Sequence, residues 1–288
     1  MFVFQLMGGV GNQLFQYAAA RALSLKRNIP FKVEFDDPYK FVKRSYNLDF
    51  FNLSVEFATK KELANCKPKK RFEKRWWLLT GRNPENKLVK EKADYVFDAA
   101  FFDIPDGSYV TGFWQAENYI LSVRDILLKE LQPRLGPSEA NAKILQQVAQ
   151  SNAISLHIRR GDYVTVAHTN SAHGTCDMEY YKKAMAYMAS KVSDPVFFIF
   201  SDDMAWVKAN LSQNYPMVFV DMNDANTSYE DLRIMSSCNH HIIANSSFSW
   251  WGAWLNNRSN KMVICPTKWT SKHLSAEIDL IPKSWIKL

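Results

Sequence analysis

The chain has 288 residues, 47% of them apolar and 23% charged, which is typical of a folded globular protein and argues against a disordered chain. Lysine and arginine exceed the acidic residues by 36 to 29. The net charge of +7 favours an anionic partner such as a nucleotide, a nucleic acid or an acidic membrane surface. No run of about 18 apolar residues is present, and the N-terminus lacks the basic and apolar regions of a signal peptide.

The cysteines are few and widely spaced. They stand at Cys66, Cys176, Cys238 and Cys265, without a CxxC pair or the spacing of a zinc module. This pattern predicts reduced thiols in a cytoplasmic protein.

The N-terminal segment is predicted to be a β-α-β unit, with a strand at Phe2–Leu6, a glycine-rich loop, a helix from Asn12 and a second strand at Phe31–Phe35. The loop partly imitates a dinucleotide-binding fingerprint, with Glu34 in the position of its ribose acid. The third glycine position, however, holds Leu14. The alternative is a loop that presents Gly11, Asn12, Gln13 and backbone N–H groups to a cleft between domains.

The middle of the chain has no clear periodicity. Residues 36–108 mix charges and aromatic rings, and include a basic run, Lys67–Trp77, that ends in two tryptophans. A strand at Ser108–Trp114 and a helix at Glu117–Leu131 are predicted next. Pro133, Gly136 and Pro137 then mark a linker, which places two domains at residues 1–136 and 137–288.

The second half alternates short, continuously apolar strands with helices, which indicates a parallel sheet covered on both faces, a Rossmann-like α/β domain. The predicted strands are Ala153–Ile158, Pro195–Phe200, Met217–Val220, His241–Ala244 and Met262–Pro266. The predicted helices are Met178–Ala189, Asp203–Leu211, Ser228–Cys238 and Ser247–Asn256.

Polar residues follow the predicted strands, at the sheet edge where α/β proteins bind ligands. They are His157, Arg159, Arg160, Asp162 and Tyr163; Ser201, Asp202 and Asp203; Asp221, Asn223 and Asp224; and Asn245, Ser246 and Ser247. Arginine forks suit phosphate oxygens, and the helix start at Ser246 and Ser247 offers free N–H groups to an anion. Asp203 is a candidate for a guanine edge or a ribose, and His157 for a base or phosphate. Together these residues predict a nucleoside diphosphate site.

Structural roles compete with several of these assignments. Asp162 is a candidate structural partner for Arg160 or for backbone amides. Ser246 is a candidate helix cap, and one of Asp202 and Asp203 is expected to cap the next helix. Core positions are favoured for Trp250, Trp251 and Trp254, and structural roles for His240 and His241. Because Tyr180 and Tyr181 are adjacent, at most one is expected to face the core, and the other is a candidate for lining the site.

Four ordered motifs carry a family resemblance: MGGVGNQLFQYAAARALS, HIRRGDYV, FSDD and NSSFSWWGAWLN. The sequence resembles the α-1,2-fucosyltransferases of glycosyltransferase family 11, and HIRRGDY resembles their donor-binding motif. The HGTC…YY segment (His173, Gly174, Cys176, Tyr180 and Tyr181) resembles the bacterial branch. The resemblance implies a GT-B-type fold, with two Rossmann-like domains facing each other across a cleft. The implied reaction transfers fucose from GDP-fucose to O2 of a galactoside, with inversion and without a metal.

The site residues follow from both arguments. Arg159, Asp162 and His157 are the catalytic candidates. The donor-site candidates are His157, Arg159, Arg160, Asp202, Asp203, Asn245, Ser246, Ser247, Phe248, Asn12, Gln13 and Gly11. The base that activates the acceptor is left open among Asp162, His168, His173, Glu179 and donor phosphate.

The expected partners are GDP-fucose and a galactose-terminated oligosaccharide or glycolipid, with no cofactor and no metal. The expected location is the cytoplasm. The basic Lys67–Trp77 run suggests a weak contact with the inner membrane face. A nucleic-acid-binding protein is the alternative suggested by the same run, and another nucleotide-sugar transferase is a third reading.

Overall fold

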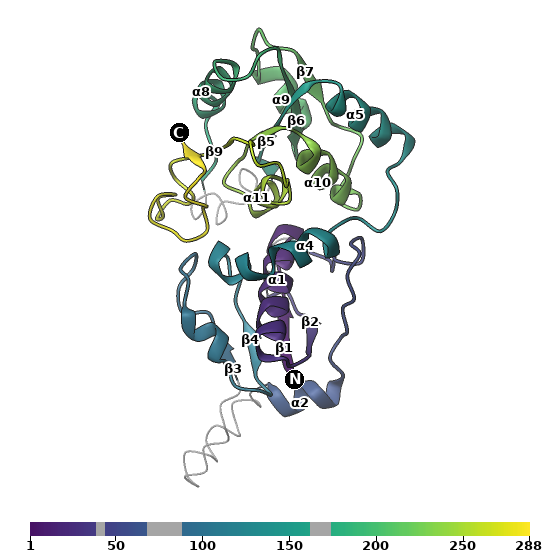
Figure 1. The fold of residues 1–288 in the computed structure, drawn as a ribbon, viewed down its shortest axis with the longest axis vertical. Coiled ribbons are helices and arrows are strands. Elements are labelled where there is room, and N and C mark those ends of the chain that lie inside the picture. The colour runs from purple at the N-terminus through teal and green to yellow at the C-terminus, as the bar shows by residue number, and fades with distance from the viewer. Residues whose placement is uncertain (39–43, 68–87, 162–173) are drawn as a thin grey trace. The chain divides into compact units, whose positions relative to one another are not determined.

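A computed structural model describes residues 1–38, 44–67, 88–161 and 174–288. The chain divides into two compact units (Figure 1). The first comprises Met1–Asp49 and Leu53–Leu127, and the second comprises Phe50–Asn52 and Leu128–Leu288.

The first unit is built on a parallel sheet in the order β2-β1-β4-β3. Its strands are β1 (Phe2–Leu6), β2 (Phe31–Phe35), β3 (Leu88–Lys90) and β4 (Tyr109–Thr111). Its helices are α1 (Val10–Arg27) and α2 (Lys60–Cys66) with the short 3₁₀ turns η1 (Ala99–Asp103), η2 (Glu117–Tyr119) and η3 (Leu121–Val123), and α4 (Arg124–Glu130) follows. Phe4 contacts Phe101, whereas Val3, on the opposite face of β1, packs with Cys66 of α2.

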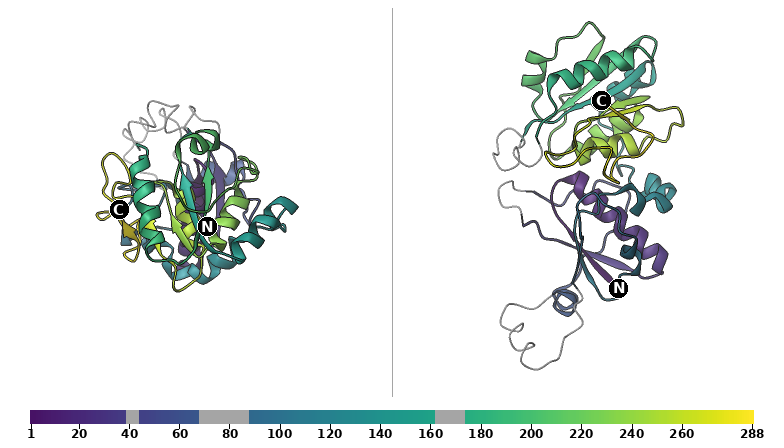
Figure 2. Two further views of the ribbon diagram at one scale, coloured as in Figure 1. Left: turned by 90° about the horizontal axis from the view of Figure 1, so that it is seen from above. Right: turned by 90° about the vertical axis from the view of Figure 1, so that its left-hand side faces the viewer.

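The second unit is built on a parallel sheet in the order β10-β9-β8-β5-β6-β7. Its strands are β5 (Asn152–Ile158), β6 (Pro195–Ser201), β7 (Met217–Phe219), β8 (His240–Ile242), β9 (Val263–Cys265) and β10 (Ile286–Lys287). Its helices are α5 (Glu139–Ala149), α8 (Met178–Ala189), α9 (Met204–Asn210), α10 (Ser228–Ser237) and α11 (Ser247–Trp254). Helices α8 and α9 cover one face of this sheet and helices α5 and α10 cover the other (Figures 1 and 2). Core side chains of the sheet pack with these helices on both faces.

A short segment from the first half of the sequence completes the second unit. Asn52 donates its backbone N–H to Gln132 O at 2.7 Å, and Arg134 donates its own to Phe50 O at 2.8 Å. The Phe50 ring stacks on Tyr229 of α10, with 4.5 Å between ring centres. Residues 50–52 therefore form a strap that binds the start of the second unit's own chain to α10.

The predicted elements of the second half are confirmed, with ends that shift by one or two residues; helix α5 and strand β10 were not predicted. The first half differs more. The helix predicted from Asn12 begins at Val10, and the strand predicted at Ser108–Trp114 is only Tyr109–Thr111. The predicted helix Glu117–Leu131 is two 3₁₀ turns followed by α4. Its continuous helical pattern fails at Ile120, whose N–H bonds Glu117 O three residues back.

In the part of the chain that the structure describes, no helix combines the length and the apolar character needed to cross a membrane. The basic run that suggested membrane contact lies, apart from Lys67, outside the described residues.

The tryptophan-rich helix α11 is buried inside the second unit from Ser249 to Trp254. Trp250, Trp251 and Trp254 are each at most 2% exposed and contact one another, which confirms their core role. A Cβ at Gly252 would lie 2.8 Å from Met235 Sδ and 2.9 Å from Met235 Cβ, so glycine permits the close approach of α11 to α10.

Gly252→Ala should therefore destabilise the protein by about 1–3 kcal/mol, because the added methyl group overpacks the contact with Met235. Urea unfolding monitored by circular dichroism measures this. Gly136→Ala is the matched control, since a Cβ there meets nothing within 4 Å. Equal stability of the two variants would contradict the close-packing explanation.

Candidate functional site

The neighbouring strands β8, β5 and β6 bring three of the four predicted groups of polar residues in the second unit to one sheet edge. All three strands are parallel, with Ile158 paired to Ser201 and Leu156 paired to Ile242. Their carboxyl ends therefore lie together. The expectation that the segments after these strands converge is confirmed, and the contacts between them define the candidate site.

Asp202 holds the turn that follows β5. One carboxylate oxygen, Oδ1, accepts the backbone N–H of Arg160 at 2.8 Å, and Oδ2 lies 2.8 Å from Arg159 Nη1. A Cβ at Gly161 would lie 2.3 Å from Asp202 Oδ2. The glycine in this motif thus makes room for the carboxylate that fixes the two arginines.

Arg160 is held by a different acid and by an aromatic ring. Its guanidinium carbon lies 3.5 Å from the centre of the Trp206 ring, and its Nε lies 3.4 Å from Asp203 Oδ2. Asp203 also accepts the N–H of Trp206 at 3.2 Å, so Asp203 is the N-cap of α9, as expected for one of the two aspartates. Asp162, the anticipated partner of Arg160, lies outside the described residues.

His157 is a buried, neutral histidine at the end of β5. It is 5% exposed, and burial lowers its pKa to about 4; Asp202 acts to raise that pKa and Arg159 to lower it. The imidazole ring lies 5.7 Å from the Phe248 ring of α11. Its Nδ1 is buried and has no hydrogen-bond partner among the described residues. Buried polar atoms without a partner are few in folded proteins, so this atom singles out His157 as a candidate for a role beyond packing.

The start of α11 forms the next part of the edge. Ser246 is 7% exposed, and its hydroxyl accepts the Phe248 N–H at 3.3 Å, which confirms its capping role. The amide of Asn245 donates to Gly174 O and Trp269 O, both at 3.2 Å, and the Cys176 thiol donates to Asn245 Oδ1. Asn245 therefore joins two loops, while the partly exposed Ser247 opens the first helical turn.

The expectation that only one of Tyr180 and Tyr181 is buried is wrong. Tyr180 is 9% exposed and Tyr181 is 1% exposed. The Tyr180 hydroxyl donates to Ile243 O at 2.7 Å, which satisfies its polar end, and the two rings pack edge to face 5.0 Å apart. Both tyrosines of α8 belong to the core cluster between this helix and the sheet, and Ile243, just after β8, accepts the Tyr180 hydroxyl.

His241 has the structural role expected for it. Asn256 Nδ2 donates to His241 Nε2 at 2.8 Å, so the proton sits on Nδ1 and is donated to Ser155 Oγ, also at 2.8 Å. Burial holds the pKa of His241 well below its usual value. His240 Nδ1 accepts the Met262 N–H at 3.0 Å, so it too is engaged in the fold.

In the first unit, Gln13, which was predicted to contact the sugar donor, is fully buried and joins two segments. Its Nε2 donates to Gly8 O and to Ser45 O, each at 2.8 Å, and its Oε1 accepts the Asn47 N–H at 3.0 Å. Both amide hydrogens are used inside the unit, which assigns Gln13 to holding residues 45–47 against α1.

Its neighbours Gly11 and Asn12 lie in the first turn of α1, where Asn12 Oδ1 accepts the Gln115 amide at 2.8 Å. Glu34, the residue that imitates a ribose acid, accepts the Tyr109 hydroxyl at 2.6 Å and pairs with Lys67 at 2.5 Å. It thus has structural partners on the sheet.

No group of three or more histidine, cysteine, aspartate or glutamate residues within the described ranges has an arrangement that could hold a metal ion. The positive charge at the site comes from Arg159 and Arg160, each next to one carboxylate.

The buried His157 should make stability depend on pH. Its pKa is about 4 when folded and about 6.5 when unfolded, so the unfolded chain binds more protons between these values, and stability falls as pH falls through this window. From pH 7 to about pH 5, wild type should lose about 2 kcal/mol more than His157→Asn in urea unfolding.

Asp231 supplies a control of opposite sign. Burial raises its pKa to about 7, so the folded protein binds the extra proton and gains stability on acidification. Asp231→Asn should therefore lose more stability than wild type over the same interval. The same pH dependence in wild type and His157→Asn would contradict the buried neutral state of His157.

Comparisons with known proteins agree with this architecture. Residues 85–288 match the family described as Glycosyl transferase family 11. An alpha-1,2-colitosyltransferase of Escherichia coli is 32% identical, over 99% of this chain and 98% of its own. The galactoside 2-alpha-L-fucosyltransferase SEC1 of Bos taurus is 32% identical over 36% of this chain and 29% of its own.

Among solved structures, an arginine-to-lysine mutant of Arabidopsis thaliana FUT1 in complex with GDP aligns with a TM-score of 0.52 and 10% identity, over 99% of this chain and 75% of that one. This likeness concerns the fold, the GT-B-type α/β architecture with two Rossmann-like units, and confirms the predicted fold class. With the family match over most of its length and a full-length relative, the chain belongs to glycosyl transferase family 11.

Proposed function

We propose that this glycosyltransferase moves L-fucose from GDP-fucose to O2 of a terminal β-galactoside, with inversion and without a metal ion. The observation that carries the proposal is the pair of arginines fixed by Asp202 and Asp203 at the carboxyl edge of the second sheet. Family membership and the name of the bovine relative support the choice of reaction. The proposed location is the cytoplasm.

The donor is proposed to bind mainly to residues 137–288, and the acceptor mainly to residues 1–136. Arg159 and Arg160 would bind the diphosphate, together with N–H groups of the first turn of α11 near Ser246 and Ser247. His157 and Phe248 would contact the nucleotide, with His157 Nδ1, which has no partner among the described residues, as a hydrogen-bonding group. Because both carboxylates are engaged with arginines, Asp202 and Asp203 are proposed to act through them.

The chemistry would follow from charge on the leaving group. Sugar transfer passes through an oxocarbenium-like state while negative charge grows on the departing GDP. Guanidinium groups already in place stabilise that charge without reorganisation. Gly11 and Asn12 remain proposed contacts from the first unit. Asp162, the proposed catalytic carboxylate nearest the arginines in sequence, lies outside the described residues, as do His168 and His173.

A donor panel tests the function. GDP-fucose and GDP-colitose should be compared with a set of β-galactosides, and the product linkage determined by NMR. Colitose is L-fucose without its 3-hydroxyl group, and the full-length relative is named for its transfer, which makes it the second candidate donor. A fucosyl group on galactose O2 supports the proposal. Transfer of colitose without transfer of fucose would show that the donor is GDP-colitose instead of GDP-fucose. No transfer from either donor would overturn the proposed function.

Chelation tests the role of the arginines in place of a metal. Activity with EDTA should remain near its untreated level, because Arg159 and Arg160 supply the positive charge at the diphosphate. Loss of turnover that Mn²⁺ restores would instead identify Asp202 and Asp203 as metal ligands. Initial rates with and without EDTA, at equal ionic strength, provide the measurement.

Arg159→Ala should lower kcat by on the order of 10²–10³, because the contact strengthens as charge develops on GDP. Arg159→Lys should recover only part of the loss, since an ammonium cannot replace a two-pronged fork. Lys143→Ala removes a cation from an exposed ion pair with Glu139 on α5, and should retain wild-type kcat. If Arg159→Ala keeps more than about half of wild-type kcat/KM, a loss under about 0.5 kcal/mol, the assignment fails.

A further inference from the structure

We propose that Trp206 is a positioning residue that holds the guanidinium of Arg160 flat and directs its two terminal amino groups toward the donor diphosphate. The role in catalysis rests on the proposed function, whereas the arrangement itself concerns only Arg160, Asp203 and Trp206.

Three contacts fix Arg160 from separate directions. Its backbone N–H donates to Asp202 at 2.8 Å, its Nε donates to Asp203 at 3.4 Å, and its guanidinium carbon lies over the Trp206 ring, 3.5 Å from the ring centre. The Arg160 side chain is 20% exposed, so it is not sealed inside the unit. Within the described ranges neither terminal amino group has a hydrogen-bond partner, which leaves both as donors for a ligand.

Stacking on an aromatic ring holds a guanidinium without using its N–H groups. The attraction is between the cation and the ring face, so it consumes none of the five donors. A second carboxylate in the place of Trp206 would fix the arginine but would also occupy its fork and oppose an incoming phosphate. Trp206 therefore combines a fixed orientation with an open, positively charged end.

Trp206 is itself held in place. Its backbone N–H bonds the Asp203 cap, and its side chain packs against the core between the sheet and helices α8 and α9. Asp203 thus holds both partners of the stack: it accepts the backbone N–H of Trp206 and the Nε–H of Arg160. Arg159 differs, because its Nη1 is already paired with Asp202.

The geometry is tested by NMR of the arginine Nε–Hε signals. The Arg160 signal, identified by its loss in Arg160→Lys, should lie upfield because the Trp206 ring current shields it. It should move downfield in Trp206→Leu and stay near its wild-type position in Trp206→Phe. An unshifted wild-type signal, or a signal that does not respond to Trp206→Leu, would overturn the stacking regardless of what the enzyme transfers.

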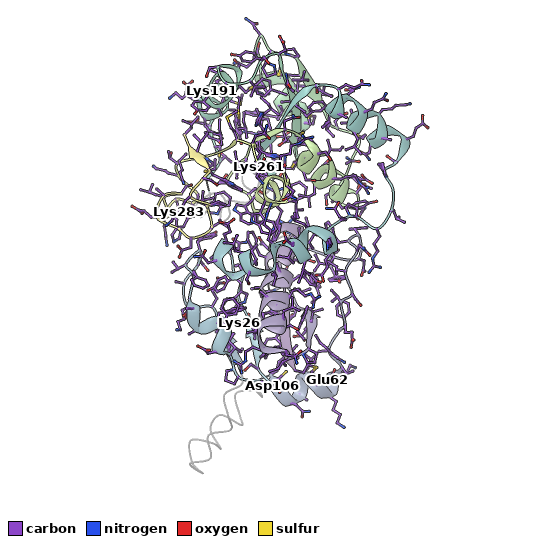
Figure 3. All side chains as sticks on the ribbon, viewed as in Figure 1. Lys26, Glu62, Asp106, Lys191, Lys261 and Lys283 are labelled. Carbon is purple, nitrogen blue, oxygen red and sulfur yellow. The ribbon has the colours of Figure 1, made fainter. Side chains whose placement is uncertain are left out.

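The catalytic role is tested by kinetics with GDP-fucose. Trp206→Leu should reduce kcat/KM by about tenfold or more, since small misplacements of a positioned group can cost up to about 10²-fold. Trp206→Phe should recover most of the loss. Tyr187→Leu is the matched control: Tyr187 packs against the same core cluster and has Lys191 at 5.9 Å over its ring (Lys191 is labelled beside α8 in Figure 3). It should keep wild-type kinetics.

A double-mutant cycle separates positioning from a general structural effect. If Trp206 acts through Arg160, Trp206→Leu should change kcat/KM by less than about twofold in an Arg160→Ala background. An equal loss in both backgrounds would overturn the positioning role.

If wild type transfers no fucose, the proposed function fails. In that case GDP binding replaces kcat/KM in the cycle, and an Arg160-independent loss of affinity would again overturn the proposal.

Discussion

The second unit's site depends on one carboxylate, that of Asp202, placed where β5 and β6 end side by side. It joins the backbone of Arg160 and the side chain of Arg159 to the neighbouring strand end, and leaves no room for a side chain at residue 161. Two guanidinium groups on consecutive residues repel each other, and a half-buried position increases that repulsion. The two aspartates, one for each arginine, stabilise the arrangement before any ligand is present.

The site could be located from sequence because the sheet is parallel. Short, continuously apolar runs such as Pro195–Phe200 that alternate with helices are typical of parallel strands buried on both faces, and the rule that parallel strands end at one edge then groups Arg159, Asp202 and Ser246 correctly. The pairing within the group was not accessible. Proximity in sequence suggests Asp162 for Arg160, and Asp162 lies outside the described residues; the structure shows that Arg160 pairs with Asp203, which follows the neighbouring strand β6. Trp206 was missed because an aromatic residue near a helix start is usually core.

In the first unit, sequence patterns predict residue roles and helices less well. Gln13 belongs to a motif that suggested a donor contact, but its amide is used to hold backbone groups of two loops. The role of such a buried amide side chain depends on which backbone groups lack a hydrogen-bond partner in the folded protein. That property cannot be derived from the spacing of residues along the sequence. The 3₁₀ turns around Ile120 are likewise stabilised by tertiary packing, with Tyr119 and Ile120 fully buried, and their sequence still reads as a helix.

The strap of residues 50–52 has a consequence for dissecting this enzyme into parts. Because the chain enters the second unit at Phe50, leaves it after Asn52 and returns at Leu128, neither unit is a continuous stretch of sequence. A fragment that starts at residue 137 would lack both the strap and residues 128–136, and would leave the Tyr229 ring and the Arg233 guanidinium of α10 without Phe50 and Leu135 O. Independent folding of the second unit thus calls for a circularly permuted chain, or one with the strap fused to it, rather than a simple truncation.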